Sequence, residues 1–328
     1  MSEITHEISL NNFHHQINWA LQNYCPHGLK SDQFNHIVIG GLGGSGIGGR
    51  IARQAMLNNF PIPIEVFSTY QLPGYAGKKT LVILCSYSGN TEETLAMYND
   101  AKNRGCAMIC LGSGGKIMEL AKQDHIPCYL IEKGYQPRMS LGYSLSTLLM
   151  ILAELSGTEV SDTLKTTADA LFHNDNLKQE AQKITDFFSH TIHHKFVVVC
   201  DSDFEAVAIR FCQQIQENAK GESFVTVLPE ANHNVIESYH EQHETNFIML
   251  NSGNNARTNL RFEFLHKVLL EQNNRIYSFP AAGSGVQRLF EIIHILDWVS
   301  IYASNLRKAN NMRVDIIMRL KGFLDSAQ

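Results

Sequence analysis

The stretch IVIGGLGGSGIGG occupies residues 37–49 and joins an apolar run to a glycine-rich loop. Residues 37–39 favour β structure, which predicts a buried strand. The residues after the loop, through Arg53 and Met56, predict a helix. Residues 41–46 match the spacing G-x-G-x-x-G, in which backbone N–H groups and a helix N-terminus attract an anion. This order of strand, loop and helix is typical of the first unit of an α/β fold.

Short apolar runs recur through the first half of the chain, with helix-favouring segments between them. A helical stretch around residues 17–25 precedes the first strand. The further runs that predict strands are residues 62–67, 80–85, 107–111 and 128–131. Strands that alternate with helices in this way form a parallel, doubly wound sheet flanked by helices. Residues 1–155 are therefore predicted to form one α/β domain.

The second half repeats this order after a polar segment at residues 156–194, which is predicted to be a helical linker. Strands are predicted at residues 195–200, 223–228, 246–250 and 275–279, and helices at 204–219 and from 287 to about 308. Residues 195–328 thus predict a second α/β domain, and the shared order suggests an old duplication. Only the first domain has the glycine loop. We therefore expect one domain to bind phosphate and the other to supply the chemistry.

Composition argues against several classes of partner. The chain has 328 residues, of which 44% are hydrophobic and 18% charged, and a formal net charge of -5. This balance provides no basic field for nucleic acid. The N-terminal residues are polar and no apolar run approaches about 20 residues, so we expect no membrane segment and a cytoplasmic location. The seven cysteines are scattered without C-x-x-C pairs and are expected to be reduced core residues.

A second polar loop follows the strand predicted at residues 80–85. It reads SYSGNTEET over residues 86–94 and ends where a helix is predicted to begin. Ser86, Ser88 and Thr91 can donate hydroxyl hydrogen bonds to a phosphate monoester, and the helix N-terminus adds backbone N–H groups. The alternative is an ordinary helix N-cap with a capping box.

A dinucleotide site is another interpretation of the glycine loop. It would place an acidic residue at the end of the second strand, about 20 residues further on. Glu65 has that spacing, but Val66 and Phe67 continue the strand pattern beyond it. A nicotinamide-dependent dehydrogenase would also leave the hydroxyls of the second loop without a role, so a phosphate site is favoured.

The two loops together are similar to those of a known class of protein. IGGLGGSG at residues 39–46, followed by SYSGNT at residues 86–91, resembles the phosphate-binding half of sugar isomerase (SIS) domains. With the motifs below, nearly the whole chain resembles the bifunctional phosphoglucose/phosphomannose isomerases. The resemblance implies two SIS-type domains, and phosphate contacts from Gly44, Ser45 and Gly46 beside the hydroxyl loop. It also implies that a phosphorylated hexose is isomerised, glucose 6-phosphate to fructose 6-phosphate and mannose 6-phosphate as a further substrate.

Moving a carbonyl between C1 and C2 of a sugar phosphate requires a base, a positive group beside the developing oxyanion, and a proton relay for ring opening. This chemistry requires no metal and no redox cofactor, and none is expected here. The segment QENAKG at residues 216–221 resembles the stretch that carries the base in this family, which implies that Glu217 transfers the proton. By itself the segment favours a solvated helix end in which Glu217 pairs with Lys220.

His233 lies in PEANHN at residues 229–234, which is similar to the N-H-N segment of the family. The resemblance implies that His233 opens the sugar ring in the active site of the neighbouring subunit, so a homodimer with shared active sites is expected. A neutral imidazole can accept and return a hydroxyl proton near neutral pH. The spacing of His233, His240 and His243 fits no common zinc pattern, so we expect no metal site.

Arg138 stands in YQPRMS at residues 135–140, and matches the family position whose arginine faces the enediolate. The resemblance implies that its guanidinium stabilises the negative charge at O1 or O2, because that group stays protonated and presents a fork of donors. A surface arginine on a loop is the alternative.

Three further residues are possible substrate contacts: Lys220, Tyr87 and Met312. The family has an Asp-Pro-Thr-Pro stretch shortly before an Ile-x-x-Leu-Lys helix, and associates its threonine with acceptance of the mannose configuration at C2. Here IMRLK at residues 317–321 keeps the helix, but NNMR at residues 310–313 precedes it. Met312 cannot donate a hydrogen bond, so activity on mannose 6-phosphate depends on the part of the resemblance that this sequence matches less well.

Two other functions are compatible with the phosphate loops. A sugar-phosphate-sensing SIS module would keep the loops and lack a base, and another isomerase of this fold would act on a different phosphosugar. Glu217 and His233 argue against the sensing module, as does the absence of a basic DNA-binding arm from this sequence. The two-domain length and the Glu-Asn-Ala-Lys segment favour a phosphohexose substrate.

Overall fold

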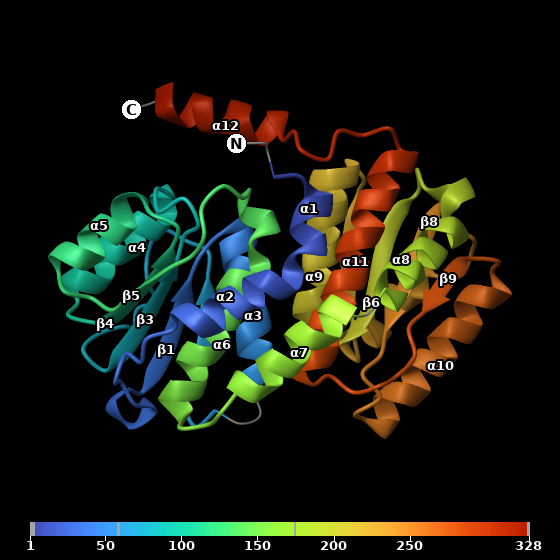
Figure 1. Cartoon of the computed structure of the whole chain (residues 1–328). Helices are drawn as coiled ribbons and strands as arrows, with labels where there is room; N and C mark the ends of the chain where they lie inside the picture. Colours follow the sequence, from blue (N-terminus) through green and yellow to red (C-terminus); the bar gives the residue numbers. More distant parts are fainter. Residues whose placement is uncertain (1–3, 58–59, 174, 327–328) are drawn as a thin grey trace. The chain divides into compact units, whose positions relative to one another are not determined.

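The computed structural model of the chain describes residues 4–57, 60–173 and 175–326 (Figure 1). The chain divides into two compact units. Unit 1 consists mainly of residues 8–173 with 284–290, and unit 2 mainly of residues 175–283 with 291–326. The segment predicted as a linker, residues 156–194, contains α7 (Ser161–His173) and α8 (Asn176–Phe187), which fall in different units.

Unit 1 is built on a parallel sheet with the strand order β2-β1-β3-β4-β5. The strands are β1 (His36–Gly40), β2 (Ile64–Phe67), β3 (Thr80–Cys85), β4 (Ala107–Gly112) and β5 (Cys128–Leu130). Every pair of neighbours is parallel, and β3 is buried along its whole length because helices cover both faces. The predicted doubly wound sheet is therefore confirmed, with strand ends that differ from the predicted ones by up to two residues.

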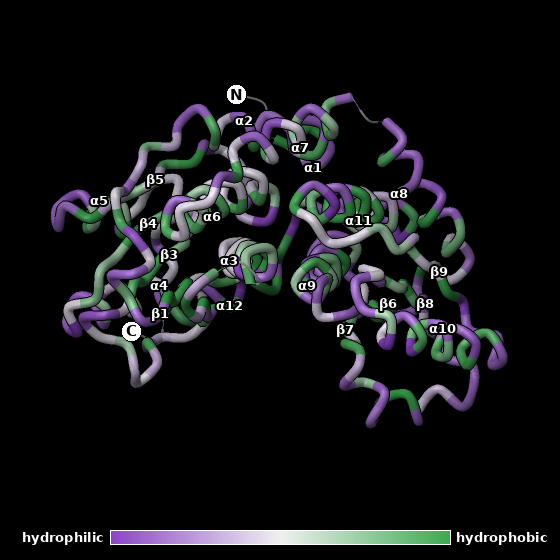
Figure 2. The backbone as a smooth tube through the Cα atoms, turned by 90° about the horizontal axis from the view of Figure 1, so that it is seen from below, coloured by the Kyte–Doolittle hydropathy of each residue, from purple (hydrophilic) through white to green (hydrophobic). Residues whose placement is uncertain are grey.

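The two faces of this sheet are covered by different helices. The helices of unit 1 are α1 (His6–Asn11), α2 (Phe13–Asn23), α3 (Gly43–Met56), α4 (Glu92–Asn103), α5 (Gly115–Gln123), α6 (Leu141–Ser156) and α7. In Figure 1, α4 and α5 lie on one face, where Val82, Met97 and Ile117 share a core, and α3 and α6 lie on the other. Hydrophobic residues run along α6, β3 and β4 (Figure 2), and α6 is almost wholly buried.

Unit 2 repeats the arrangement with the strand order β7-β6-β8-β9, again parallel throughout. Its elements are β6 (Lys195–Asp201), α9 (Glu205–Gln214), β7 (Ser223–Leu228), β8 (Thr245–Leu250), α10 (Ala256–Glu271), β9 (Arg275–Ser278), α12 (Asp315–Ser326) and, from residue 291 onward, α11 (Val286–Leu306). Alternate residues of β6 point to opposite faces. Val197 and Val199 therefore pack with Phe262 of α10, whereas Phe196 packs edge-on against Phe211 of α9.

The helix predicted at residues 204–219 differs from the one observed. After α9 the chain continues as a π-helical turn, Ile215–Ala219. The N–H of the next residue, Lys220, donates a hydrogen bond to Ile215 O. Lys220 has a φ of 55°, in the left-handed region. Hydrophobic periodicity predicts the helix but carries no signal for this wider turn.

No helix among the residues that the structure describes is both long and apolar enough to span a membrane.

A buried ion pair joins α9 to α11 in unit 2. Arg210 Nη2 donates to Asp297 Oδ2 at 2.6 Å and Nε to Oδ1 at 3.1 Å, and the two side chains are only 4% and 2% exposed. Burial raises the pKa of Asp297, against the opposing effect of the facing guanidinium. Each charge is tolerated inside the unit because the other is present.

We expect Asp297→Asn to lower the free energy of unfolding by about 3–5 kcal/mol, because it leaves the Arg210 guanidinium buried without a countercharge. Urea denaturation followed by circular dichroism would measure this loss. The double variant Arg210→Met/Asp297→Leu should recover most of it. Asp162→Asn, which breaks an exposed pair with Lys165, should change stability by less than about 0.5 kcal/mol; equal losses in the two asparagine variants would contradict the argument.

Candidate functional site

The loops that follow β1, β3 and β4 meet at the carboxyl edge of the sheet in unit 1. Strands β1 and β3 are neighbours, and the helices that follow them, α3 and α4, cover opposite faces. A crevice between such strands is the usual ligand site of a doubly wound fold. The glycine loop and the hydroxyl loop, predicted from separate motifs, therefore lie side by side.

The backbones of these loops interlock so closely that only glycine fits. Gly89 has a φ of 71°, and a Cβ there would lie 1.7 Å from Gly114 O. A Cβ on Gly115 would lie 2.2 Å from Ser88 O, and one on Gly112 would lie 2.3 Å from Ser86 O. The stretch GSGG at residues 112–115 is thus a third glycine-rich strand end that supports the site. Its three glycines at the end of a predicted strand are a sequence signal for this part of the site.

The predicted hydroxyl groups lie together at the start of α4. Ser86 is buried; its Oγ lies 2.9 Å from Thr91 Oγ1 and accepts the Gly89 N–H at 3.1 Å. Ser88 is exposed, and its Oγ accepts the Asn90 N–H at 3.3 Å. Thr91 occupies the N-cap position of α4 but makes no capping hydrogen bond with its side chain to any described group. The ordinary N-cap considered as the alternative is therefore not formed.

The glycine loop contacts the segment that carries Arg138. A Cβ on Gly44 would lie 2.6 Å from Pro137 O and 3.0 Å from Arg138 N, and one on Gly46 would lie 2.5 Å from Gly41 O. Ser45 Oγ accepts the N–H of the hydroxyl-loop residue Tyr87 at 3.1 Å. Three separate segments of unit 1 are thereby held against one another, with the N-terminus of α3 at their centre.

Arg138 lies on the 3-10 turn Pro137–Met139 and is 5% exposed, so the alternative of a surface arginine is wrong. Tyr87 fixes the residues that precede Arg138. The Tyr87 hydroxyl donates to Glu132 O at 3.0 Å and accepts the Tyr135 N–H at 2.8 Å. Burial raises the pKa of Tyr87, so the hydroxyl keeps its proton near neutral pH. The structure thus gives Tyr87 a part in supporting the Arg138 segment that the sequence did not predict.

One further buried group lies beside the hydroxyl loop. Cys85 ends β3 directly before Ser86, and burial raises the pKa of its thiol to about 12. The thiol is therefore protonated and packed as a small apolar group.

Glu217 lies on the π-helical turn of unit 2 and is half-buried. The Lys220 ammonium donates to two backbone carbonyls, Glu217 O and, at 2.6 Å, Arg313 O. Lys220, predicted as a possible substrate contact, is thus a bridge between the turn and the segment before α12. π-Helical turns occur frequently at functional sites.

His233 is exposed at the end of the 3-10 turn Glu230–His233. The residues on either side of it are fixed: Asn232 Oδ1 accepts a hydrogen bond from Arg261 Nη1 at 3.2 Å, and Asn234 Oδ1 accepts the Val235 N–H at 2.6 Å. The imidazole is therefore presented at the surface of unit 2 by a held loop.

Met312 lies in the segment between α11 and α12, where its N–H donates to Asn310 Oδ1 at 3.0 Å. Among the described residues, no group of three or more His, Cys, Asp and Glu side chains is placed to bind a metal ion. The predicted residues fall into two sets: the phosphate loops and Arg138 in unit 1, and Glu217, His233, Lys220 and Met312 in unit 2.

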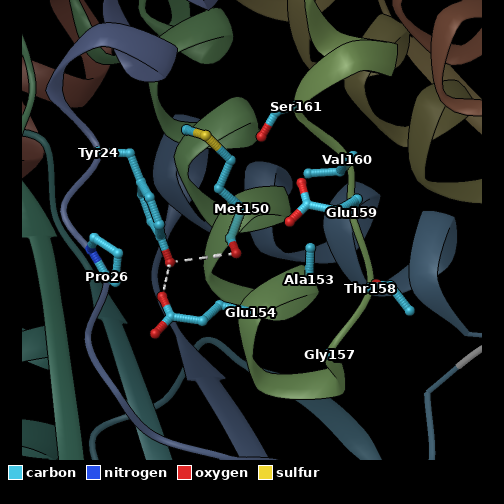
Figure 3. Close-up of a pocket in the computed structure, with 10 residues that line it drawn as sticks. All are labelled: Tyr24, Pro26, Met150, Ala153, Glu154, Gly157, Thr158, Glu159, Val160 and Ser161. Atoms are coloured by element: carbon cyan, nitrogen blue, oxygen red, sulfur yellow. Dashed lines mark hydrogen bonds between the residues drawn. The ribbon is translucent and has the colours of Figure 1, made fainter.

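A pocket of about 410 Å³ lies elsewhere in unit 1, at the end of α6 (Figure 3). Because α6 has 16 residues, this pocket is roughly 24 Å from the start of the helix, beside Arg138. The Glu154 carboxylate that lines it accepts hydrogen bonds from Tyr24 Oη at 2.6 Å, Gly28 N at 2.7 Å and His27 N at 3.1 Å. These bonds hold the loop after α2, so the pocket does not belong to the site.

Comparison with known proteins bears on the fold and the family of the chain. Residues 177–324 match the family model described as the bacterial phospho-glucose isomerase C-terminal SIS domain. The C-terminal domain of glucosamine-fructose-6-phosphate aminotransferase from Francisella tularensis has the same fold, with a TM-score of 0.75, 12% identity, and coverage of 93% of this chain and 96% of that one. The chain thus shares its fold with that domain, and residues 177–324 match a sugar isomerase domain.

Sequence relatives narrow the class. The bifunctional phosphoglucose/phosphomannose isomerase of Caldicellulosiruptor bescii is 33% identical over 311 residues, which cover 90% of this chain and 91% of the relative. The chain belongs to the bifunctional phosphoglucose/phosphomannose isomerase family. A D-glucosamine-6-phosphate 4-epimerase from Sulfolobus acidocaldarius is 34% identical over 213 residues, which cover 65% of this chain and 66% of that protein.

We expect Gly44→Ala to weaken binding of a phosphorylated hexose by roughly ten- to a hundredfold, because the added Cβ must displace the Pro137–Arg138 peptide. Isothermal titration calorimetry with fructose 6-phosphate would measure the change. Gly77→Ala is the matched control, since a Cβ at Gly77 meets open space. Equal affinities for the two variants would contradict the close contact.

Proposed function

We propose that the protein is a cytoplasmic aldose–ketose isomerase that interconverts glucose 6-phosphate and fructose 6-phosphate, and also accepts mannose 6-phosphate. The observation that carries this proposal is the contact of the Gly44 loop with the peptide before Arg138, because it joins an anion site to a buried guanidinium. The name of the relative from Caldicellulosiruptor bescii supports the same substrates.

In the proposed reaction, the substrate phosphate accepts hydrogen bonds from the N–H groups of Gly44, Ser45 and Gly46 and from the hydroxyl loop. With the open-chain aldose, the Glu217 carboxylate removes the proton from C2, and the C1 oxygen gains the negative charge of a cis-enediolate. Arg138 stabilises this charge. Glu217 returns the proton to C1 while the proton of the C2 hydroxyl passes to O1, which leaves a ketone at C2 and a hydroxyl at C1, so no electron acceptor is needed.

Ring opening requires a separate proton transfer, from the anomeric hydroxyl to the ring oxygen. We assign it to His233, whose exposed position suits a residue that serves a neighbouring subunit. The proposed assembly is therefore a homodimer with shared active sites, in which each His233 completes the site of its partner.

A different phosphosugar is the second candidate substrate, and the identity to a glucosamine 6-phosphate epimerase is the observation that favours it. A coupled assay of chelator-treated protein with fructose 6-phosphate, following glucose 6-phosphate and mannose 6-phosphate separately, tests the proposal. Both products support the bifunctional enzyme, and glucose 6-phosphate alone would restrict its range. If neither product forms while sugar phosphate still binds, the chain acts on another phosphosugar or only senses it.

Glu217→Gln should lower kcat by roughly 10³-fold or more, because the amide cannot accept the substrate proton. Affinity for fructose 6-phosphate, measured by calorimetry, should change little, since the phosphate loops are untouched. Glu222→Gln replaces an exposed glutamate nearby and serves as the control. Near-normal turnover by Glu217→Gln would remove Glu217 as the base.

Mixing two inactive variants tests the shared site. Equal amounts of Glu217→Gln and His233→Ala chains, unfolded together and refolded, should recover about a quarter of the wild-type activity. Half of the dimers are then mixed, and one of the two sites in each has both residues intact. If His233 acted within its own subunit, every site would lack one residue and no activity would return.

A further inference from the structure

The π-helical turn that carries Glu217 is fastened to α11 by one of its own side chains. Asn218 is fully buried, and its Nδ2 donates to Ser300 Oγ at 3.0 Å. Ser300 Oγ in turn donates to Asp297 O at 2.6 Å, one helical turn back along α11. In the segment Glu-Asn-Ala-Lys, therefore, the asparagine next to the base is an anchor.

Arg307, just beyond the end of α11, holds the other end of the turn. Its Nε donates to Ala219 O at 2.8 Å and its Nη2 to Lys220 O at 3.2 Å, and its Nη1 donates to Ile192 O at 2.7 Å. The carbonyls at the end of a helix lack hydrogen-bond donors within the helix, so the guanidinium supplies the N–H donors that the turn itself cannot. Gly221 packs beside this guanidinium, since a Cβ there would lie 3.4 Å from Arg307 Cζ, at van der Waals contact.

This fastening matters because a π turn is a rare conformation that stands one residue out of register with an α-helix. If the turn relaxed to α-helical spacing, the side chain at position 217 would move by about 100° around the helix axis. The carboxylate would then point in another direction while α9 and the sheet stayed intact. Contacts that hold the last carbonyls of the turn therefore bear on the direction of the base.

We propose that Arg307 is a positioning residue for Glu217: its guanidinium fixes the end of the π turn and so the direction of the carboxylate. Ser300 supports the same turn through Asn218. This inference rests on the proposed function, because it assumes that Glu217 is the base. It assigns no contact between Arg307 and the substrate.

The test compares Arg307→Lys and Arg307→Met with wild type in steady-state assays using fructose 6-phosphate. Lysine keeps the positive charge but loses the planar set of N–H donors, and methionine loses both. Both variants should therefore lower kcat by about ten- to a hundredfold, with KM changed less than about twofold. The deuterium isotope effect with glucose 6-phosphate labelled at C2 should rise, because proton transfer becomes slower. Hydrogen exchange should show less protection of the Lys220 and Gly221 amides, which bond to Ile215 O.

The matched control is Arg104→Met in unit 1. Arg104 also holds two backbone carbonyls, Pro73 O at 2.9 Å and Leu72 O at 3.5 Å, and follows the last residue of the 12-residue helix α4. That helix places it roughly 18 Å from the phosphate loops. This variant should lose stability while keeping kcat, the isotope effect and the exchange rates at Lys220 and Gly221.

If Arg307→Met lost stability like the control but kept kcat and the isotope effect, Arg307 would be a structural cap and the inference would be wrong. Should Arg307→Met fail to fold, Arg307→Lys and Ser300→Ala are the milder variants, and unchanged kcat in both would overturn the proposal. Wild-type protein is assayed first: if it lacks isomerase activity, the proposed function fails, whereas active wild type with unaffected variants refutes only the positioning role.

Discussion

Backbone atoms at the carboxyl ends of β3 and β4 approach so closely that no side chain fits between them. Gly89 and Gly115 lie against the carbonyls of Gly114 and Ser88, and the site depends on this contact. It brings the start of α4 beside the glycine loop and leaves the hydroxyls of Ser86 and Thr91 facing each other. Glycine is needed here less for flexibility than for the absence of a Cβ, because the two loops must share one small volume.

The sheet and the phosphate loops could be predicted because their signals are local. A strand of β-branched and apolar residues, followed by glycine or hydroxyl residues and then a helix, specifies both the element and its place at the strand end. The burial of Arg138 could not be predicted in this way. The residues that precede it are held by Tyr87, whose hydroxyl bonds to backbone groups about 45 positions further along the chain.

The π-helical turn was also beyond the reach of the sequence. Its apolar spacing resembles that of an ordinary helix, and the groups that stabilise it, Ser300 and Arg307, lie more than 80 residues away. The segment Glu-Asn-Ala-Lys looks like a polar helix end, but its four residues have different surroundings. Asn218 and Ala219 are buried, whereas Lys220 takes a left-handed conformation that costs about 1–2 kcal/mol and bridges to Arg313.

Cys85 has a consequence for how this site can be observed. Its thiol is buried at the end of β3 and is hardly ionised at neutral pH, so a thiol reagent reaches it only when the structure around that strand end opens. The rate of labelling at this position therefore measures how often this edge of the sheet opens. The protein thus contains a native probe at the strand end from which the hydroxyl loop begins.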